Sequence, residues 1–168
     1  MSNRFDYATQ ASKMPEGLPF NGVRLFRYAL ITEATMNLAS AIPMILTPDY
    51  MLSFMVKGPD QITPFTRAMT QWLGGIVIGM TVPLVLSVPH VPRAAAGRRM
   101  TYTMLGACEM GLSAVMAMQL LQGADSGLKP QALVSAMGVF GAILLERVFF
   151  LFVRPTWMEG QENAKKVR

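Results

Sequence analysis

Four apolar runs, each about 20 residues long, constrain the fold of this chain more than any other feature. A helix of about 20 residues crosses the roughly 30 Å hydrocarbon core of a bilayer. Apolar residues make up 52% of the chain and charged residues 15%, and the runs lack the charge in every turn that a soluble helix carries on its outer face. We therefore predict an all-α integral membrane protein with transmembrane helices at about residues 23–46, 65–88, 100–121 and 132–153.

Short connections between these runs predict a four-helix bundle in which successive helices are antiparallel neighbours. Proline and glycine mark each connection, and the first one contains an apolar stretch, Tyr50–Val56, that we expect to form a partial helix at the membrane interface. The predicted organisation is an N-terminal arm at 1–22, a four-span domain at 23–153 and a basic tail at 154–168.

The distribution of Lys and Arg predicts the orientation in the membrane. Eleven of the fifteen lie in the N-terminal segment up to Arg27, the second connection and the tail, three lie in the first connection up to Arg67 and in the third, and Arg147 lies in the fourth helix. This asymmetry places both termini in the cytoplasm. The net charge of +5 then suits anionic headgroups and gives no reason to expect nucleic acid. Lys165 and Lys166, third and fourth from the end of the chain, resemble a dilysine retrieval signal, so we expect the endoplasmic reticulum membrane; a solvated basic tail is the alternative. The polar residues 1–22 do not have the pattern of a cleavable signal peptide.

The predicted helices contain four ionisable residues, Glu33, Glu109, Glu146 and Arg147. A charge at the centre of a bilayer costs about 2.5 to 3.5 kcal/mol on insertion scales, so such residues are the first candidates for a functional site. The three glutamates lie at similar depths, about 11 to 14 Å from the cytoplasmic ends of their helices. We therefore expect three acids from three helices to share one layer. Arg147 lies about 100° around its helix from Glu146, and we expect it to pair with an acid on an adjacent helix or to reach the headgroups.

Helical periodicity adds polar residues beside two of the glutamates. Asn37 and Ser40 continue the stripe of Glu33, and Ser113 follows Glu109 by one turn. The prediction is a polar bundle interior that these side chains surround.

Small residues predict where helices pack closely. Gly138 and Ala142 precede Glu146 in one row and should let a neighbouring helix approach while the carboxyl points inward. The segment Gly75–Gly79 is a GxxxG motif, which close helix packing explains. We expect Cys108, the single cysteine, to be a small buried side chain.

Like charges in a dry site cannot all stay ionised, so at least one acid is expected to be protonated near neutrality, as a general acid requires. We assign Glu109 as the general acid, with Glu33 and Glu146 as its base or electrostatic partner. Trp72 near the outer end of the second helix is a candidate ligand contact or an interfacial anchor. The residues predicted to bind or orient substrate are Asn37, Ser40, Trp72, Ser113 and Arg147.

No cofactor or metal is predicted. His90 is the single histidine, which leaves no multi-histidine metal site and no second histidine for a haem. A metal bridged by the three carboxylates is a minor alternative. His90 itself is a solvated turn residue or, alternatively, a proton exchanger for the acids.

The arrangement resembles, in general design, the small polytopic enzymes of sterol and terpenoid metabolism, in which membrane-embedded carboxylates protonate an alkene or epoxide. It is also similar to small four-span membrane families of unknown function. The first resemblance covers architecture and implies a place in secondary-metabolite or sterol-type biosynthesis. We predict a multi-pass membrane enzyme that isomerises or cyclises a hydrophobic lipid or terpenoid-like substrate by carboxylate acid-base chemistry.

Two alternatives belong to other classes. The glutamates can hydrogen-bond across helices merely to hold the bundle, in which case the protein is a non-catalytic accessory, scaffold or lipid-binding protein. A small proton-linked transporter is the third hypothesis. The expected partners are membrane lipids, a hydrophobic small-molecule substrate, and partner enzymes or a second copy of the chain.

Overall fold

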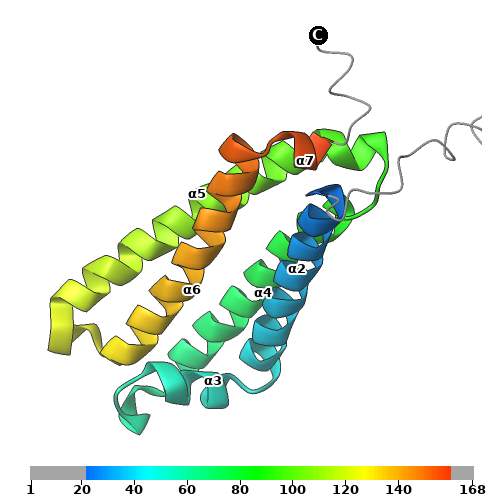
Figure 1. Cartoon of the computed structure of the whole chain (residues 1–168). Coiled ribbons are helices and arrows are strands. Elements are labelled where there is room, and N and C mark those ends of the chain that lie inside the picture. The colour runs from blue at the N-terminus through cyan, green and yellow to red at the C-terminus, as the bar shows by residue number, and fades with distance from the viewer. Residues whose placement is uncertain (1–21, 160–168) are drawn as a thin grey trace, which may run out of the picture.

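The computed structural model describes residues 22–159, and these residues form an all-helical membrane-type bundle (Figure 1). Its long helices are α2 (Gly22–Leu46), α4 (Pro64–Ser87), α5 (Pro92–Gln122) and α6 (Pro130–Val148), and α6 continues into the π-helical segment η4 (Phe149–Val153). Four segments are long and apolar enough to cross a membrane, namely Gly22–Leu46, Pro64–Ser87, Arg93–Gln122 and Pro130–Val153. The prediction of four spanning helices is confirmed. The third helix begins eight residues earlier than predicted, at Pro92, because proline fits the first turn of a helix.

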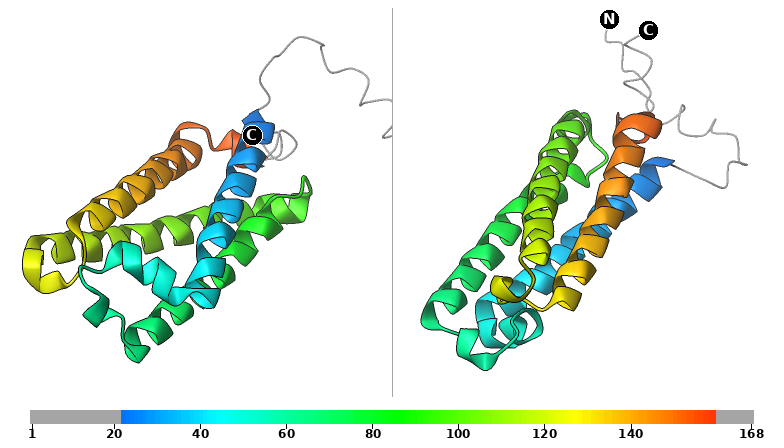
Figure 2. Two further views of the ribbon diagram at one scale, coloured as in Figure 1. Left: turned by 90° about the horizontal axis from the view of Figure 1, so that it is seen from below. Right: turned by 90° about the vertical axis from the view of Figure 1, so that its left-hand side faces the viewer.

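The helices form two antiparallel hairpins. α2 packs mainly on α4, and α5 packs mainly on α6, while α4 also contacts α5 (Figures 1 and 2). Sequential neighbours thus pack together, as short connections require. We call the end at which α2 begins and α6 ends the terminal end, and the opposite end the loop end.

The loop end is closed by short elements. α3 (Pro48–Met55) confirms the partial helix predicted in the first connection; the 3-10 helix η2 (Pro59–Gln61) follows it, and η3 (Gly123–Ser126) joins α5 to α6. Lys57 N donates to Gly127 O at 3.0 Å, and Lys129 N donates to Met55 O at 2.7 Å. These backbone bonds fasten the first connection to the third.

The terminal end is closed by α7 (Thr156–Glu159), which contacts α2 and α5. Arg98 is fully buried there and donates to three backbone carbonyls, those of Ser87 at 2.8 Å, Pro89 at 2.7 Å and Met158 at 2.8 Å. Arg27 donates to the carbonyl of Val88 at 2.9 Å. Two arginines therefore bind the carbonyl of Ser87, the last residue of α4, and those of Val88 and Pro89 just after it.

The apolar core lies in the half of the bundle nearer the terminal end. Phe26 and Leu30 of α2 pack there with Leu84, Tyr102 and Phe150 from the other three long segments. The ring centroid of Phe26 is 5.1 Å from that of Tyr102 and 5.0 Å from that of Phe150. Tyr102 joins this core to the intramembrane acids, because its hydroxyl donates to Glu146.

Several predictions of close packing are wrong. A Cβ atom added to Gly75, Gly79 or Gly138 would meet nothing within 4 Å, and Ala142 is exposed. The glycine that α2 does approach is Gly74, where an added Cβ would lie 3.0 Å from the carbonyl oxygen of Ala41. Leu133 and Arg147 are the buried residues of α6, so they mark the face that meets the other helices. The row of Gly138 and Ala142 therefore faces outward.

One single residue also differs from expectation, because Cys108 is exposed on the surface of α5 rather than buried. Residues 1–21 of the predicted N-terminal arm and residues 160–168 of the predicted tail, with its two lysines, lie outside the described residues.

Candidate functional site

Glu33 is the acid that α2 contributes to the bundle interior. Phe26, Leu30 and Glu33 follow the spacing that places residues on one face of a helix. The two apolar residues pack into the core, and Glu33 on the same face is 7% exposed. Its carboxylate is therefore buried between helices, and it needs a partner there.

Arg147 of α6 supplies that partner and a second one. Its side chain is 1% exposed, and its Nη2 atom donates to Oε1 of Glu33. The same guanidinium donates from Nε to Oε2 of Glu109 at 2.8 Å and from Nη2 to Oε1 at 2.7 Å. Glu109 lies on α5 and is 6% exposed. One arginine thus joins acids from two other helices, which is the adjacent-helix pairing expected for Arg147.

Tyr102 and Gly106 of α5 shape the space that Arg147 occupies. The Cζ atom of Arg147 lies 4.7 Å from the centroid of the Tyr102 ring, in a cation–π arrangement. A Cβ atom on Gly106 would lie 3.4 Å from Cδ of Arg147, so the missing side chain lets the arginine stem pass close to α5. The face of α5 on which Tyr102, Gly106 and Glu109 recur is the face that receives Arg147.

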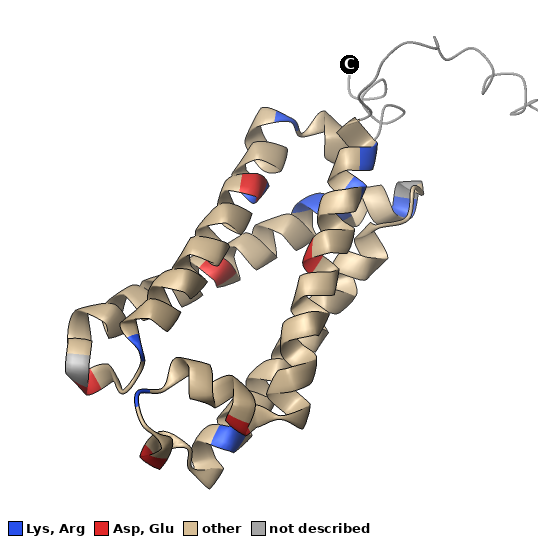
Figure 3. Cartoon of the chain, turned by 60° about the horizontal axis from the view of Figure 1, so that its bottom comes forward, with Lys and Arg blue, Asp and Glu red and all other residues tan. Residues whose placement is uncertain are grey.

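Glu146 is attached to this group through the same tyrosine. The Tyr102 hydroxyl donates to Oε1 of Glu146 at 3.3 Å, and Glu146 is half-buried. We call Glu33, Tyr102, Glu109, Glu146 and Arg147 the Arg147 cluster. Figure 3 shows its acids along the helices rather than at the loops. The acids of three helices meet around one arginine and one tyrosine.

Burial without full hydrogen bonding marks two members of the cluster. Among the described residues, three buried side-chain atoms lack a hydrogen-bond partner: Oε2 of Glu33, Nη1 of Arg147 and Oγ of Ser113. Buried polar atoms are normally paired, so each such atom calls for an explanation. Glu109, by contrast, has both carboxylate oxygens bonded to Arg147.

The Arg147 cluster contains one cation and three acids, so its charges do not cancel when all the acids are ionised. One guanidinium faces the carboxylates of Glu33 and Glu109, and Glu146 is adjacent. Burying ions is costly even when they are paired, and an unpaired buried charge costs more. A site of this kind favours binding or transfer of a proton and disfavours an added anion.

The remaining predicted site residues are less closely connected to the cluster. Asn37 and Ser40 are half-buried, and Ser40 Oγ donates to the backbone carbonyl of Asn37 at 2.9 Å, within α2. Ser113 lies one turn beyond Glu109 on α5 and is half-buried. Trp72 is 65% exposed on α4, so the structure does not bring it to the cluster.

Sequence reasoning missed the buried roles of Tyr102 and Arg98. The Tyr102 side chain is fully buried beside Arg147. Its spacing of seven residues from Glu109, which puts both on one face, was the available signal. Arg98 was counted among the basic residues of a connection, and no local pattern distinguishes it from exposed Arg99 beside it.

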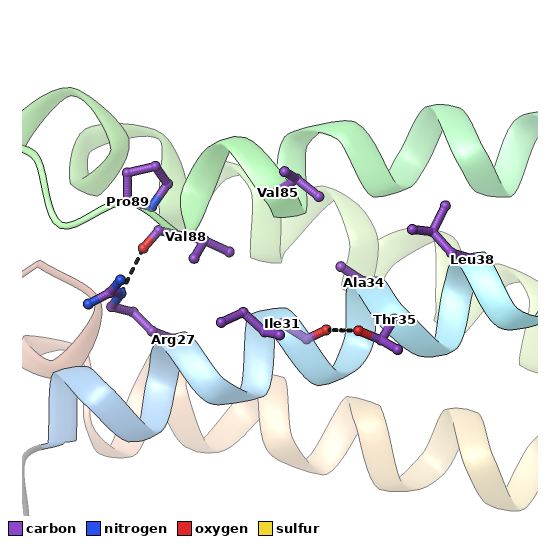
Figure 4. A pocket seen from close by; sticks show the side chains of 8 residues that line it. All are labelled: Arg27, Ile31, Ala34, Thr35, Leu38, Val85, Val88 and Pro89. Carbon is purple, nitrogen blue, oxygen red and sulfur yellow. Dashed lines mark hydrogen bonds between the residues drawn. The ribbon is translucent and has the colours of Figure 1, made fainter.

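A second feature is an apolar groove on the outside of the α2/α4 hairpin (Figure 4). It has a volume of about 460 Å³, and no member of the Arg147 cluster lines it. The Thr35 hydroxyl donates within α2 to the carbonyl of Ile31 at 2.8 Å, so its hydrogen is not offered to the groove. The groove is lined by Arg27, Ile31, Ala34, Thr35, Leu38, Val85, Val88 and Pro89.

Metal binding has little support in the part of the chain that the structure describes. Residues 22–159 contain no group of three or more His, Cys, Asp or Glu side chains placed to hold a metal ion. Glu33 and Glu109 are instead bridged by Arg147.

Comparisons of the chain with models of protein families, with curated proteins and with solved structures found no match.

Proposed function

We propose that this protein is an integral membrane enzyme that performs acid-base chemistry, an isomerisation or cyclisation, on a hydrophobic lipid or terpenoid-like molecule. The observation that carries the proposal is the Arg147 cluster, in which acids from three helices meet inside the membrane-spanning bundle. Ionisable residues are rare at such depth and are functional-site candidates by default. An apolar environment also excludes water, which strengthens electrostatic interactions with a reacting group.

The proposed roles follow from which carboxylate oxygens are engaged. Both carboxylate oxygens of Glu109 accept hydrogen bonds from Arg147, so Glu109 acts as the fixed counter-ion of that arginine. Glu33 is held at Oε1 and has Oε2 free to take or return a proton. Glu146, hydrogen-bonded to Tyr102, is the second proton-transfer group. The geometry thus favours Glu33 and Glu146 for proton transfer, in contrast to the sequence-based assignment of Glu109 as the general acid.

An isomerisation needs no net proton supply under this scheme. Glu146 gives a proton to one carbon of the substrate, Glu33 removes a proton from another carbon, and return of that proton from Glu33 to Glu146 restores the starting state. Arg147 stays cationic throughout and offsets one of the two negative charges of the acids that it contacts. Asn37 lies one helical turn beyond Glu33, and Ser113 lies one turn beyond Glu109. Both would orient the bound molecule.

The proposed setting is the endoplasmic reticulum membrane with both termini in the cytoplasm. The positions of the lysines and arginines support this orientation. Substrate would enter sideways from the bilayer, and enzymes acting before or after it would be natural partners.

Metabolite profiling tests the proposal. A strain that lacks the gene should accumulate a hydrophobic precursor and lose its isomer or cyclised product, and the wild-type gene should restore the product. The Glu33→Gln gene should fail to restore it although the protein is inserted in normal amounts. Restoration by Glu33→Gln at the wild-type level would contradict the assigned chemistry.

The apolar groove favours a second candidate, a non-catalytic lipid-binding accessory protein. Its lining is almost entirely aliphatic, and Arg27 at one end could contact a headgroup. This alternative predicts loss of function when Leu38→Trp fills the groove and full function in Glu33→Gln. The enzyme proposal predicts the opposite pair of results.

A further inference from the structure

The guanidinium of Arg147 has two hydrogen-bonding edges, and they are used differently. The edge formed by Nε and Nη2 is filled by both oxygens of Glu109. The other edge, formed by Nη2 and Nη1, has Glu33 bonded only at Nη2. A complete two-point pair would also join Nη1 to Oε2 of Glu33, because the spacing of the fork matches a carboxylate.

Both atoms of that missing second contact are buried and without a partner among residues 22–159. Arg147 is 1% exposed and Glu33 is 7% exposed, so surrounding solvent does not hydrogen-bond to either atom. Nη1 is a donor, and Oε2 of an ionised carboxylate is an acceptor. They flank one ion pair, so a single atom that both accepts and donates would complete the hydrogen bonding of both.

The chemistry of this gap selects the group that fits it. A hydroxyl oxygen accepts from Nη1 and donates to Oε2, whereas a ketone or ether oxygen satisfies Nη1 alone. A carboxylate or phosphate would add negative charge beside two acids, and an ammonium would face the guanidinium. The apolar core that includes Tyr102, the ring beside Arg147, also contains Leu30, Leu105 and Phe150, which suit an apolar remainder of the ligand.

We propose that the Arg147 cluster binds the hydroxyl group of a neutral hydrophobic molecule, an alcohol, phenol or enol, between Nη1 of Arg147 and Oε2 of Glu33. This inference rests on the proposed function, since it names the substrate class of that same site. It is testable by binding alone, without turnover.

Three matched probes test it on the full-length protein in mild detergent. Para-octylphenol can donate and accept, para-octylanisole can only accept, and octylbenzene can do neither. The rise in melting temperature with probe concentration gives an apparent affinity for each. Because a hydrogen bond to a charged group is worth about 1.5 to 3 kcal/mol, we expect the phenol to bind at least about tenfold more tightly than the anisole. Equal shifts from all three probes would overturn the proposal and would indicate detergent-like binding.

Two variants locate the effect. Glu33→Gln keeps the shape of the side chain but removes the carboxylate acceptor, so the preference for phenol over anisole should fall to about twofold or less. Leu38→Trp fills the outer groove and should leave the preference intact. A preference that survives Glu33→Gln and disappears in Leu38→Trp would place the probe in the groove and overturn the proposal. If Glu33→Gln does not fold, the wild-type and Leu38→Trp results still decide the question.

The outcomes separate this inference from the enzyme proposal. A phenol preference that depends on Glu33, together with unchanged metabolites in the deletion strain, would support the hydroxyl site and sink the enzyme. A precursor that accumulates in the deletion strain, with no phenol preference, would support the enzyme and sink the hydroxyl site.

Discussion

The two halves of this bundle are stabilised in different ways. The half near the terminal end buries large and charged side chains completely, among them Arg98, Arg147 and Tyr102. The half near the loop end buries smaller or aliphatic residues, such as Ala41, Gly74 and Leu133, and the ion pair there, from Arg67 to Asp49 at 2.5 Å, has both side chains well exposed.

This contrast separates two sources of stability inside a membrane. Lipid is as apolar as a leucine side chain, so burying apolar surface between helices gains little there, and close packing and hydrogen bonds decide association. The loop half uses the close approach of α2 and α4 at Gly74. The terminal half uses arginines that bond to acids and to carbonyl groups across helices. A polar layer of that kind can bind a ligand, whereas a seam of small residues only holds helices together.

The largest effect should follow from Arg147→Met. This change leaves Glu33 and Glu109 facing each other without a cation, and breaking a buried ion pair costs about 3 to 5 kcal/mol. We expect a marked fall in melting temperature in detergent and low amounts in the membrane. Arg67→Met is the matched control at the loop end, and its exposed ion pair contributes about 0 to 1 kcal/mol. Similar losses in the two variants would erase the contrast between the halves.

A smaller but clear loss is expected for Arg98→Met. The change removes donors from the carbonyls of Ser87, Pro89 and Met158, and we estimate a cost of about 2 to 3 kcal/mol. Thermal unfolding should detect it, and limited proteolysis should show earlier cleavage near α7. Arg99→Met, on an exposed neighbour, should change neither readout; an equal effect there would show that charge alone matters at this end.

Gly74→Ala should destabilise the loop half through crowding. Its Cβ would lie 2.8 Å from Cγ1 of Ile45 and 3.0 Å from a backbone oxygen of α2, so the hairpin must shift, at about 1 to 2 kcal/mol. Gly75→Ala, one residue along, meets nothing within 4 Å and should be neutral. Melting temperatures of the pair measure the difference. A destabilising Gly75→Ala would instead point to a contact on the outer face of α4.

The smallest change in stability is expected for Tyr102→Phe, which keeps the ring beside Arg147 and removes one hydroxyl. The lost hydrogen bond to Glu146 should cost about 0.5 to 1 kcal/mol, and product formation should fall more than stability does. Parallel assays of melting temperature and product amount separate the two effects. A variant with full product formation would remove Tyr102 and its bond to Glu146 from the proposed chemistry.

Hydropathy predicted the spanning helices because bilayer thickness sets their length, and the depths of Glu33 and Glu109 predicted that they would meet. The pairing of Arg147 with another helix followed from its angle on α6. The outward turn of Gly138 and of Gly75 could not be predicted, since small residues fit a helix contact and a lipid-facing surface equally well. Helical periodicity does not predict side-chain geometry, so it could not show which carboxylate oxygen Arg147 leaves without a hydrogen bond.

The most direct test of the central claim is the rate of product formation by Glu33→Gln in isolated membranes, divided by the amount of folded protein in the same membranes. If Glu33 transfers the proton and Glu109 only balances Arg147, the rate should fall at least about a hundredfold while the folded amount stays near that of the wild type. A wild-type rate in Glu33→Gln would contradict the account and reduce the Arg147 cluster to a device for holding the helices together.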